Sequence, residues 1–150
     1  MTKPAFPIAA ALLLSLSACS PTATGDDQVE IKDGWARATA PNQKLAAAYL
    51  TIANGSDHPV RLMSVSTDMA AKSSLHRSMT HDGIAAMRPI DDGLAIAPGE
   101  EAVLEPGGDH VMLEGLKGPL VAGQSISMTL NFDDGHSMPA TITIVAPGAR

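Results

Sequence analysis

The strongest constraint on the fold is a run of alternating residues in the second half of the sequence. Apolar side chains stand at strict period two from Ile126 through Met128 and Leu130 to Phe132, which is the pattern of a β-strand that buries one face. Similar short segments recur along the chain, and 13 Gly and 11 Pro residues separate them as turns. About eight such strands predict an all-β fold, a Greek-key β-sandwich.

Length and composition limit what this sandwich can be. A chain of 150 residues forms one domain by default. The core is expected to be aliphatic, because the sequence holds one Trp, one Tyr and two Phe. The net charge of −6, with no cluster of Lys and Arg, argues against nucleic-acid binding. The sequence contains no G-x-S-x-G, H-E-x-x-H or P-loop motif, so we predict that the protein is not an enzyme.

The N-terminal segment predicts a lipoprotein. Residues 8–18 form an apolar run of signal-peptide length, too short to span a membrane. The end of this run and the next residue, Leu16-Ser17-Ala18-Cys19, resemble the lipobox of bacterial lipoproteins, whose cysteine becomes the diacylated N-terminus. An ordinary secretory signal cleaved near Ala18 or Ser20 is the alternative. Ser20 after the cysteine fits sorting to an outer membrane, so we expect a periplasmic, membrane-anchored protein.

These features divide the chain into three parts. We predict a signal peptide over residues 1–18, the lipidated Cys19 with a flexible tether to residue 28, and a folded domain over residues 29–146. Cys19 is the only cysteine, so the domain can hold neither an intramolecular disulfide nor a Cys-rich zinc or iron–sulfur site.

The middle of the domain is expected to contain short elements. Residues 68–73 could form one helical turn, and short strands at 74–76 and 84–87 flank a loop over 77–83 that ends in Asp82-Gly83. Three methionines are expected to fill the core: Met63, Met69 and Met128.

Donor atoms for a metal gather between His76 and Met112. Two imidazoles and two thioethers in this stretch are the soft and borderline donors that suit Cu(I). His110 and Met112 lie two residues apart in a predicted strand, so they project from the same face while Val111 and Leu113 face the core. Blue-copper electron transfer is disfavoured, because such a site needs a Cys ligand and the domain has none.

Four runs of sequence resemble the periplasmic copper chaperone family of the PCu(A)C type. The runs are Gly34-Trp35-Ala36-Arg37-Ala38-Thr39, Ala46-Ala47-Ala48-Tyr49-Leu50-Thr51, Met87-Arg88-Pro89 and Pro106-Gly107-Gly108-Asp109-His110-Val111-Met112-Leu113. The resemblance extends over roughly residues 29–145 and implies a cupredoxin-like sandwich that binds Cu(I) through a His…Met…His-x-Met set. It implies that the copper ligands are His76, Met87, His110 and Met112. It also implies copper delivery toward the Cu(A) centre of a cytochrome c oxidase subunit or to another oxidase-assembly copper protein.

Two departures from the family pattern are visible. The gap from Met87 to His110 holds twenty-two residues, about one more than the usual pattern, and a turn near Pro98-Gly99 can absorb the difference. Some members carry a Met shortly after the first His, where this chain has Arg77 and Ser78 and then Met79.

The remaining His and Met residues offer auxiliary metal donors. Met79 and His81 follow His76 and could assist capture of the ion. His136-Ser137-Met138 is a second H-x-M motif, which we interpret as a surface turn, with an auxiliary copper site, such as one for Cu(II), as the alternative. His58, in a Ser-Asp-His-Pro turn, is expected to be a solvated loop residue.

Three functions remain open on the sequence alone. The first is a lipid-anchored extracytoplasmic chaperone that carries Cu(I) to an acceptor protein. The second is a lipoprotein that buffers copper for tolerance and has no dedicated acceptor. The third is a structural β-sandwich lipoprotein in which His and Met are incidental. An oxidoreductase is disfavoured by the missing thiolate.

Overall fold

A computed structural model describes residues 28–150 of the chain, which contain ten β-strands and no α-helix. The predicted signal peptide, Cys19 and nearly all of the predicted tether lie outside the described residues. In chain order the strands are β1 (Val29–Arg37), β2 (Leu45–Asn54), β3 (Val60–Ser66), β4 (Ala70–His81), β5 (Ile84–Pro89), β6 (Leu94–Ile96), β7 (Glu101–Leu104), β8 (Asp109–Leu116), β9 (Ser125–Phe132) and β10 (Ser137–Val145). The all-β prediction is therefore confirmed, with ten strands rather than about eight.

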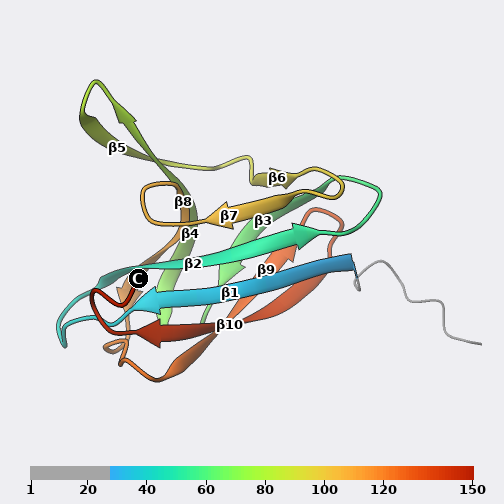
Figure 1. Cartoon of the computed structure of the whole chain (residues 1–150). Helices are drawn as coiled ribbons and strands as arrows, with labels where there is room; N and C mark the ends of the chain where they lie inside the picture. The colour runs from blue at the N-terminus through green and yellow to red at the C-terminus, as the bar shows by residue number, and fades with distance from the viewer. Residues whose placement is uncertain (1–27) are drawn as a thin grey trace, which may run out of the picture.

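The strands form one continuous path in the order β5-β4-β8-β2-β1-β10-β9-β3-β6, with β7 paired to the second half of β2 (Figure 1). Strand β1 pairs with β10 in parallel, and the other pairs are antiparallel. Strand β3 also contacts β4, which lies near the opposite end of the path. The path is therefore rolled over, and its two halves face each other as the layers of a sandwich.

Side chains from both layers meet in one aliphatic core. Strand β2 contributes Ala48, Leu50 and Ile52, as its alternation predicts, and β9 contributes the period-two run that ends at Phe132. Burial of such side chains is the main stabilising contribution to a fold of this kind. The outer faces of β4 and β8, which do not contribute to this core, remain available for other roles.

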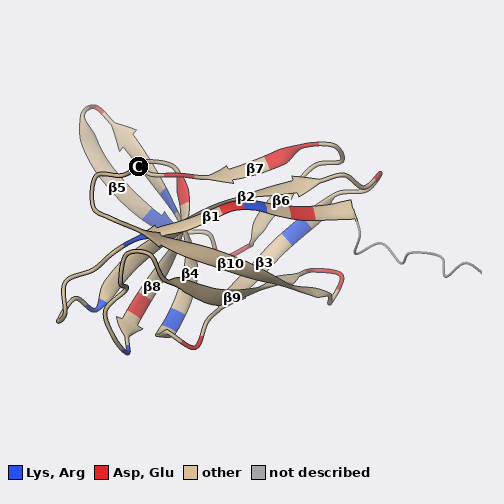
Figure 2. Cartoon of the chain, turned by 60° about the horizontal axis from the view of Figure 1, so that its bottom comes forward, with Lys and Arg blue, Asp and Glu red and all other residues tan. Residues whose placement is uncertain are grey.

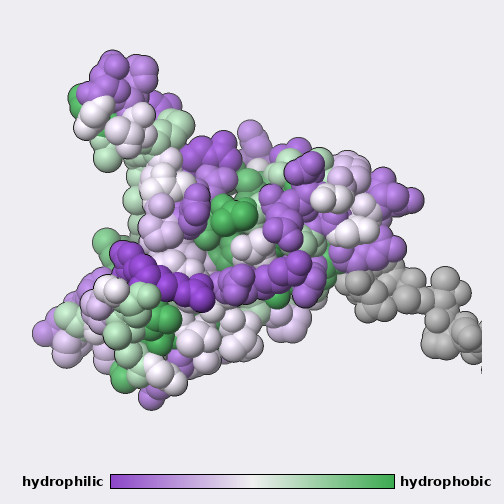
Figure 3. Space-filling view, in the orientation of Figure 1, coloured by the Kyte–Doolittle hydropathy of each residue, from purple (hydrophilic) through white to green (hydrophobic). Residues whose placement is uncertain are grey.

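Strands β4 and β5 form a hairpin that extends away from the sandwich (Figure 1). Asp82 and Gly83 connect the strands, and both have positive φ angles, 50° and 77°. Two positive φ values in a two-residue loop define a type I′ turn, whose twist matches that of the flanking strands. Every residue of β5 is exposed, and Figure 3 shows the hairpin as a lobe separate from the main body.

The structure corrects two local predictions in this region. Residues 68–73 do not form a helical turn, because β4 begins at Ala70 and pairs there with Leu116 of β8. The predicted loop over 77–83 is also wrong, since residues 77–81 continue β4 and only Asp82-Gly83 turns the chain. Hydrogen bonds to strands on both sides extend β4 beyond its weak local pattern.

One of the three methionines expected in the core lies elsewhere. Met128 is buried and Met69 packs partly against the core, whereas Met63 is 44% exposed. The register of β3 against β9 shifts between Leu62 and Ser64. An extra residue in one strand is a β-bulge, which interrupts the alternation of side chains. Met63 directly follows the buried Leu62, so alternation turns it to solvent, and the bulge returns Val65 to the core.

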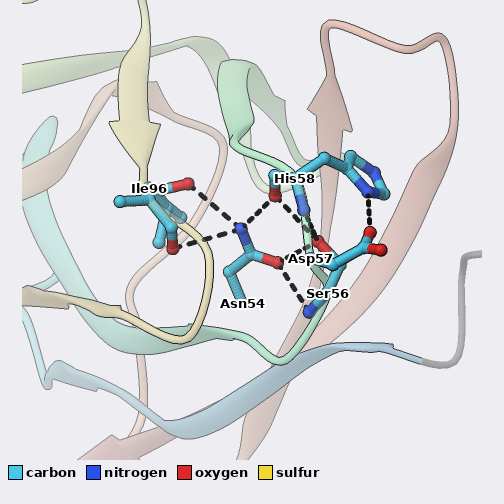
Figure 4. A network of polar contacts seen from close by, with 6 residues as sticks. Asn54, Ser56, Asp57, His58 and Ile96 are labelled. Atoms are coloured by element: carbon cyan, nitrogen blue, oxygen red, sulfur yellow. Dashed lines mark hydrogen bonds and ion pairs between the residues drawn. The ribbon is translucent and has the colours of Figure 1, made fainter.

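A buried amide connects two turns at the end of the sandwich where β1 begins. The side chain of Asn54 is 1% exposed, and its Nδ2 donates hydrogen bonds to the carbonyls of His58, Ile96 and Ala97 at 2.9, 3.1 and 3.2 Å (Figure 4). Its Oδ1 accepts bonds from the amide and the hydroxyl of Ser56. A buried amide satisfied in this way is structural. His58 itself is exposed, as predicted.

Charged residues are scattered over the described strands and do not gather in a stripe of one sign (Figure 2). No helix within residues 28–150 is long and apolar enough to cross a membrane.

Candidate metal centre

The pairing of β4 with β8 places two histidines directly opposite each other. His76 is the register partner of His110, and their rings are nearly parallel, with centroids 6.0 Å apart. Residues directly opposite each other in an antiparallel pair share one face of the sheet. Two imidazoles that are 34 positions apart in the sequence therefore form one cluster.

The two candidate methionine ligands lie on the same face as these histidines. Met112 follows His110 by two residues, and the intervening Val111 is fully buried in the core. Met87 is the register partner of Ser78, which follows His76 by two residues. Because side chains alternate along a strand, all four candidate ligands project from one face of β5, β4 and β8.

His110 is held by the main chain. It is 4% exposed, and its Nδ1–H donates a hydrogen bond to the carbonyl of Gly108 at 3.1 Å. A carbonyl oxygen can only accept, so the proton is on Nδ1 and the lone pair of Nε2 remains for a metal. The same carbonyl accepts a bond from the amide of Ser78 at 3.0 Å, which connects His110 to the base of the projecting hairpin.

Aromatic rings on the neighbouring strands enclose His110 from the other side. The ring of Tyr49 lies 6.4 Å from that of His110, and the ring of Trp35 lies 4.5 Å from that of Tyr49. Both rings are buried on the outer face of β1 and β2. His110 is therefore confined by its surroundings, whereas His76, on the next strand, is only half-buried.

A charge pair fixes the register beside the two histidines. The guanidinium of Arg77 donates two hydrogen bonds to the carboxylate of Asp109, at 2.6 and 2.7 Å. These residues are register partners next to the His76–His110 pair, and this bond raises the pKa of Arg77. Two parallel bonds between Arg and a carboxylate add geometric specificity. They hold β4 against β8 at the point where the hairpin leaves the sandwich.

The site is open toward the hairpin. Met87 is 50% exposed and lies beside a shallow hollow of about 310 Å³, which is also lined by Ser78, Met79 and Gly107. Among residues 28–150, no three His, Cys, Asp or Glu side chains lie close enough together to hold a metal ion. The thioethers of Met87 and Met112 would therefore have to complete the coordination of any ion held by the two imidazoles.

Met79 and His81 lie on the opposite face of the hairpin from Met87. They alternate with Ser78 and Thr80 along β4, and their register partners on β5 are Ala86 and Ile84. Met79 is exposed, and Nε2 of His81 lies 3.4 Å from a carboxylate oxygen of Asp82 at the tip. The structure thus places Met79 at the edge of the hollow and His81 at the tip of the hairpin, and neither lies on the face that carries the four candidate ligands.

The second H-x-M motif lies far from this face. Strand β10 begins next to His136, and its other end pairs with β1 at Trp35, roughly 20 Å along the strand. The ring of His136 stacks on Phe132 at 4.7 Å, and Nδ1 contacts the carboxylate of Asp134. Met138 packs against the core, opposite Leu130. The structure does not bring this motif together with the first.

The sequence interpretation missed several residues that support the site. Ser74 lies 3.4 Å from Nδ1 of His76, and Glu114 lies 3.5 Å from Ser74. Period two could have identified both, because Ser74 precedes His76 by two residues and Glu114 follows Met112 by two. The Arg77–Asp109 pair and the carbonyl of Gly108 depend on a register that the sequence does not reveal.

Comparison with known families agrees with this architecture. A family model described as "Putative lipoprotein LpqE-like" matches residues 29–144, which is most of the chain. The chain belongs to the LpqE-like family. The chain is also similar to the "Putative lipoprotein Lxx21020" of Leifsonia xyli subsp. xyli, with 33% identity over 143 residues, covering 90% of this chain and 85% of that protein.

Solved structures of PCuAC domains share the fold of this LpqE-like chain. The copper(I)-bound solution structure of DR1885 from Deinococcus radiodurans matches with a TM-score of 0.60 and 34% identity, over 81% of this chain and 82% of that one. The metal-free PCuAC domain of PmoF1 matches with a TM-score of 0.67 and 27% identity, over 80% of this chain and 95% of that one. The predicted resemblance to the PCu(A)C type and the cupredoxin-like sandwich are thereby confirmed.

Proposed function

We propose that this protein is an extracytoplasmic copper carrier that binds Cu(I) through His76, Met87, His110 and Met112. The observation that carries the proposal is the shared face of β5, β4 and β8, on which two stacked imidazoles lie between two thioethers. Imidazole and thioether donors suit Cu(I). The similarity to the copper(I)-bound structure of DR1885 supports the same ion.

The unequal exposure of the ligands suits a carrier that hands its ion on. His110 is enclosed and held by the main chain, whereas Met87 stands on an exposed edge strand. A donor from an acceptor protein could replace Met87 first while His110 keeps hold of the ion. Thioethers also avoid the oxidation that would threaten thiolates outside the cytoplasm. This role requires ligand exchange and no catalysis.

The proposal includes a location and a recipient. Membership in a family of lipoproteins, together with the lipobox ending at Cys19, supports attachment to a membrane through lipid, in the periplasm and at an outer membrane where the cell has one. The proposed recipient is a copper centre of respiration, the Cu(A) site of a cytochrome c oxidase subunit or an assembly protein that serves it.

The binding site is tested by a Cu(I) titration of the purified protein against a chromogenic chelator, repeated with His76→Ala and Met87→Ala. We expect one tightly bound ion in the parent protein and weaker binding in both variants. The loss should be about tenfold or more for each. Met63→Ala, which removes an exposed methionine far from the cluster, is the matched control. Binding that neither substitution weakens would refute the site.

The delivery step is tested in cells. Deletion should lower cytochrome c oxidase activity, and added copper should restore it, because excess ion bypasses a carrier. Copper sensitivity with normal oxidase activity would instead favour the alternative of a copper-buffering lipoprotein. Replacement of Cys19 by Ser should release the protein from membranes, and a variant that stays bound would refute lipidation there.

A further inference from the structure

A chain of polar groups runs behind His76 on the outer face of β4 and β8. The hydroxyl oxygen of Ser74 lies 3.4 Å from Nδ1 of His76 and 3.5 Å from Oε1 of Glu114. Ser74 is the register partner of Met112, so these polar groups lie directly beside the candidate metal ligands. They have no role in the core, since neither Ser74 nor Glu114 belongs to the apolar cluster.

The chemistry of the three groups fixes the direction of these contacts. An ionised carboxylate only accepts hydrogen bonds, so the single proton of the Ser74 hydroxyl points to Glu114. In its contact with His76, the hydroxyl oxygen must therefore be the acceptor, and Nδ1–H of His76 must be the donor. This arrangement holds the imidazole proton on Nδ1 and leaves the lone pair on Nε2. The ammonium of Lys72, 3.8 Å from Oε1 of Glu114, faces the same carboxylate from β4.

The two histidines thus reach the same protonation pattern by different means. Nδ1 of His110 is bonded to the main-chain carbonyl of Gly108, whereas Nδ1 of His76 depends on two side chains. A metal-bound histidine commonly donates its second N–H to a carbonyl or a carboxylate, which fixes the ring and strengthens the donor atom. At His76 the carboxylate acts through a hydroxyl.

We infer that Ser74 and Glu114 are positioning residues for the metal site, which hold the proton of His76 on Nδ1 and keep Nε2 ready as a donor. The effect on copper rests on the proposed function. The position of the proton, however, is a property of the metal-free protein and can be measured without copper.

The first experiment measures the side-chain ¹⁵N chemical shifts of both histidines in the metal-free protein, at a pH where the imidazoles are neutral. We expect the Nδ1–H form for both. In Ser74→Ala, His76 should become a mixture of the two neutral forms, while His110 stays unchanged as an internal reference. Ser74→Thr keeps a hydroxyl and should restore the parent spectrum. Ser73→Ala, on the opposite face of β4, is the matched control.

The second experiment measures Cu(I) affinity of the same proteins and of Glu114→Gln. We expect Ser74→Ala to weaken binding about tenfold, within the range typical of outer-shell partners. Glu114→Gln keeps an oxygen that accepts from Ser74 but loses the charge. In this variant His76 should stay in the Nδ1–H form, and Cu(I) binding should weaken by less than in Ser74→Ala.

The outcomes separate the two hypotheses. A parent His76 in the Nε2–H form, or a Ser74→Ala spectrum identical to the parent, overturns the positioning role even if copper binds tightly. A parent protein that shows the Nδ1–H form but binds no Cu(I) supports the positioning role and refutes the proposed function.

Discussion

The chain carries the same H-x-M motif twice, and the two copies lie in different surroundings. His110 and Met112 belong to a strand whose intervening residue, Val111, faces the core, so both project from the outer face beside His76. His136 instead belongs to a turn and stacks on Phe132, while Met138 packs inward opposite Leu130. An H-x-M motif therefore supplies a pair of metal donors only when its strand places both side chains on one open face, next to donors from a neighbouring strand.

The strongest test of this difference makes the same change in both motifs, His110→Gln and His136→Gln. Glutamine occupies much of the volume of histidine but supplies no imidazole nitrogen. Loss of the buried imidazole donor should cost at least the upper end of the 10–100-fold range known for outer-shell partners, so we expect His110→Gln to weaken Cu(I) binding by about 100-fold or more. His136→Gln should leave the affinity within about twofold. Competition titration with a Cu(I) chelator measures both.

Thermal unfolding of the two metal-free variants provides the control for this comparison. A His110→Gln protein that is folded but binds copper poorly supports a ligand role. Equal losses of affinity in the two variants would show that the second motif is also a copper site, as an auxiliary role for His136 and Met138 requires.

A smaller effect is expected from Met112→Leu and Met138→Leu. Leucine keeps nearly the volume of methionine and removes the thioether, so each substitution should cost less than about 1.5 kcal/mol of stability. We expect Met112→Leu to weaken Cu(I) binding about tenfold and Met138→Leu to leave it unchanged. Retention of full affinity in Met112→Leu would exclude its sulfur from the coordination sphere.

The contrast also explains which part of the site the sequence could predict. Strict alternation in β8 identifies the face of His110 and Met112, because Val111 and Leu113 are apolar. The twelve residues of β4 contain no such pattern, with only Ala70 and Leu75 buried. Its full length depends on hydrogen bonds to β5 and β8, which a local reading of the sequence cannot detect.

The position of His76 opposite His110 is likewise a property of register. Register is set by pairing between strands far apart in the sequence, and a shift of one residue would turn His76 to the other face. The Arg77–Asp109 pair and the bond from Ser78 to the carbonyl of Gly108 fix this alignment. The resemblance to a known family supplied the four candidate ligands before the structure showed how the strands align them.

The smallest expected effect concerns the turn that holds the second motif. Asp134 accepts a hydrogen bond from the amide of His136 at 3.0 Å and contacts its imidazole. This hydrogen bond from the backbone amide is the largest of the effects that lower the pKa of Asp134 below its ordinary value. A carboxylate whose pKa is lower in the folded state than in the unfolded state stabilises the fold above the unfolded pKa, about pH 4, and loses this contribution as the pH falls further.

Asp134 is half-exposed, so solvent screening should limit this contribution to about 0.5 kcal/mol. We expect Asp134→Asn to lower the free energy of unfolding by that amount at pH 7, and the difference from the parent to shrink as the pH falls below about 4. Denaturant unfolding over this pH range measures it. Cu(I) affinity should not change, because the Asp134–His136 turn and the His110–Met112 strand lie at opposite ends of the sandwich. A variant that loses copper affinity would show instead that the two ends are coupled.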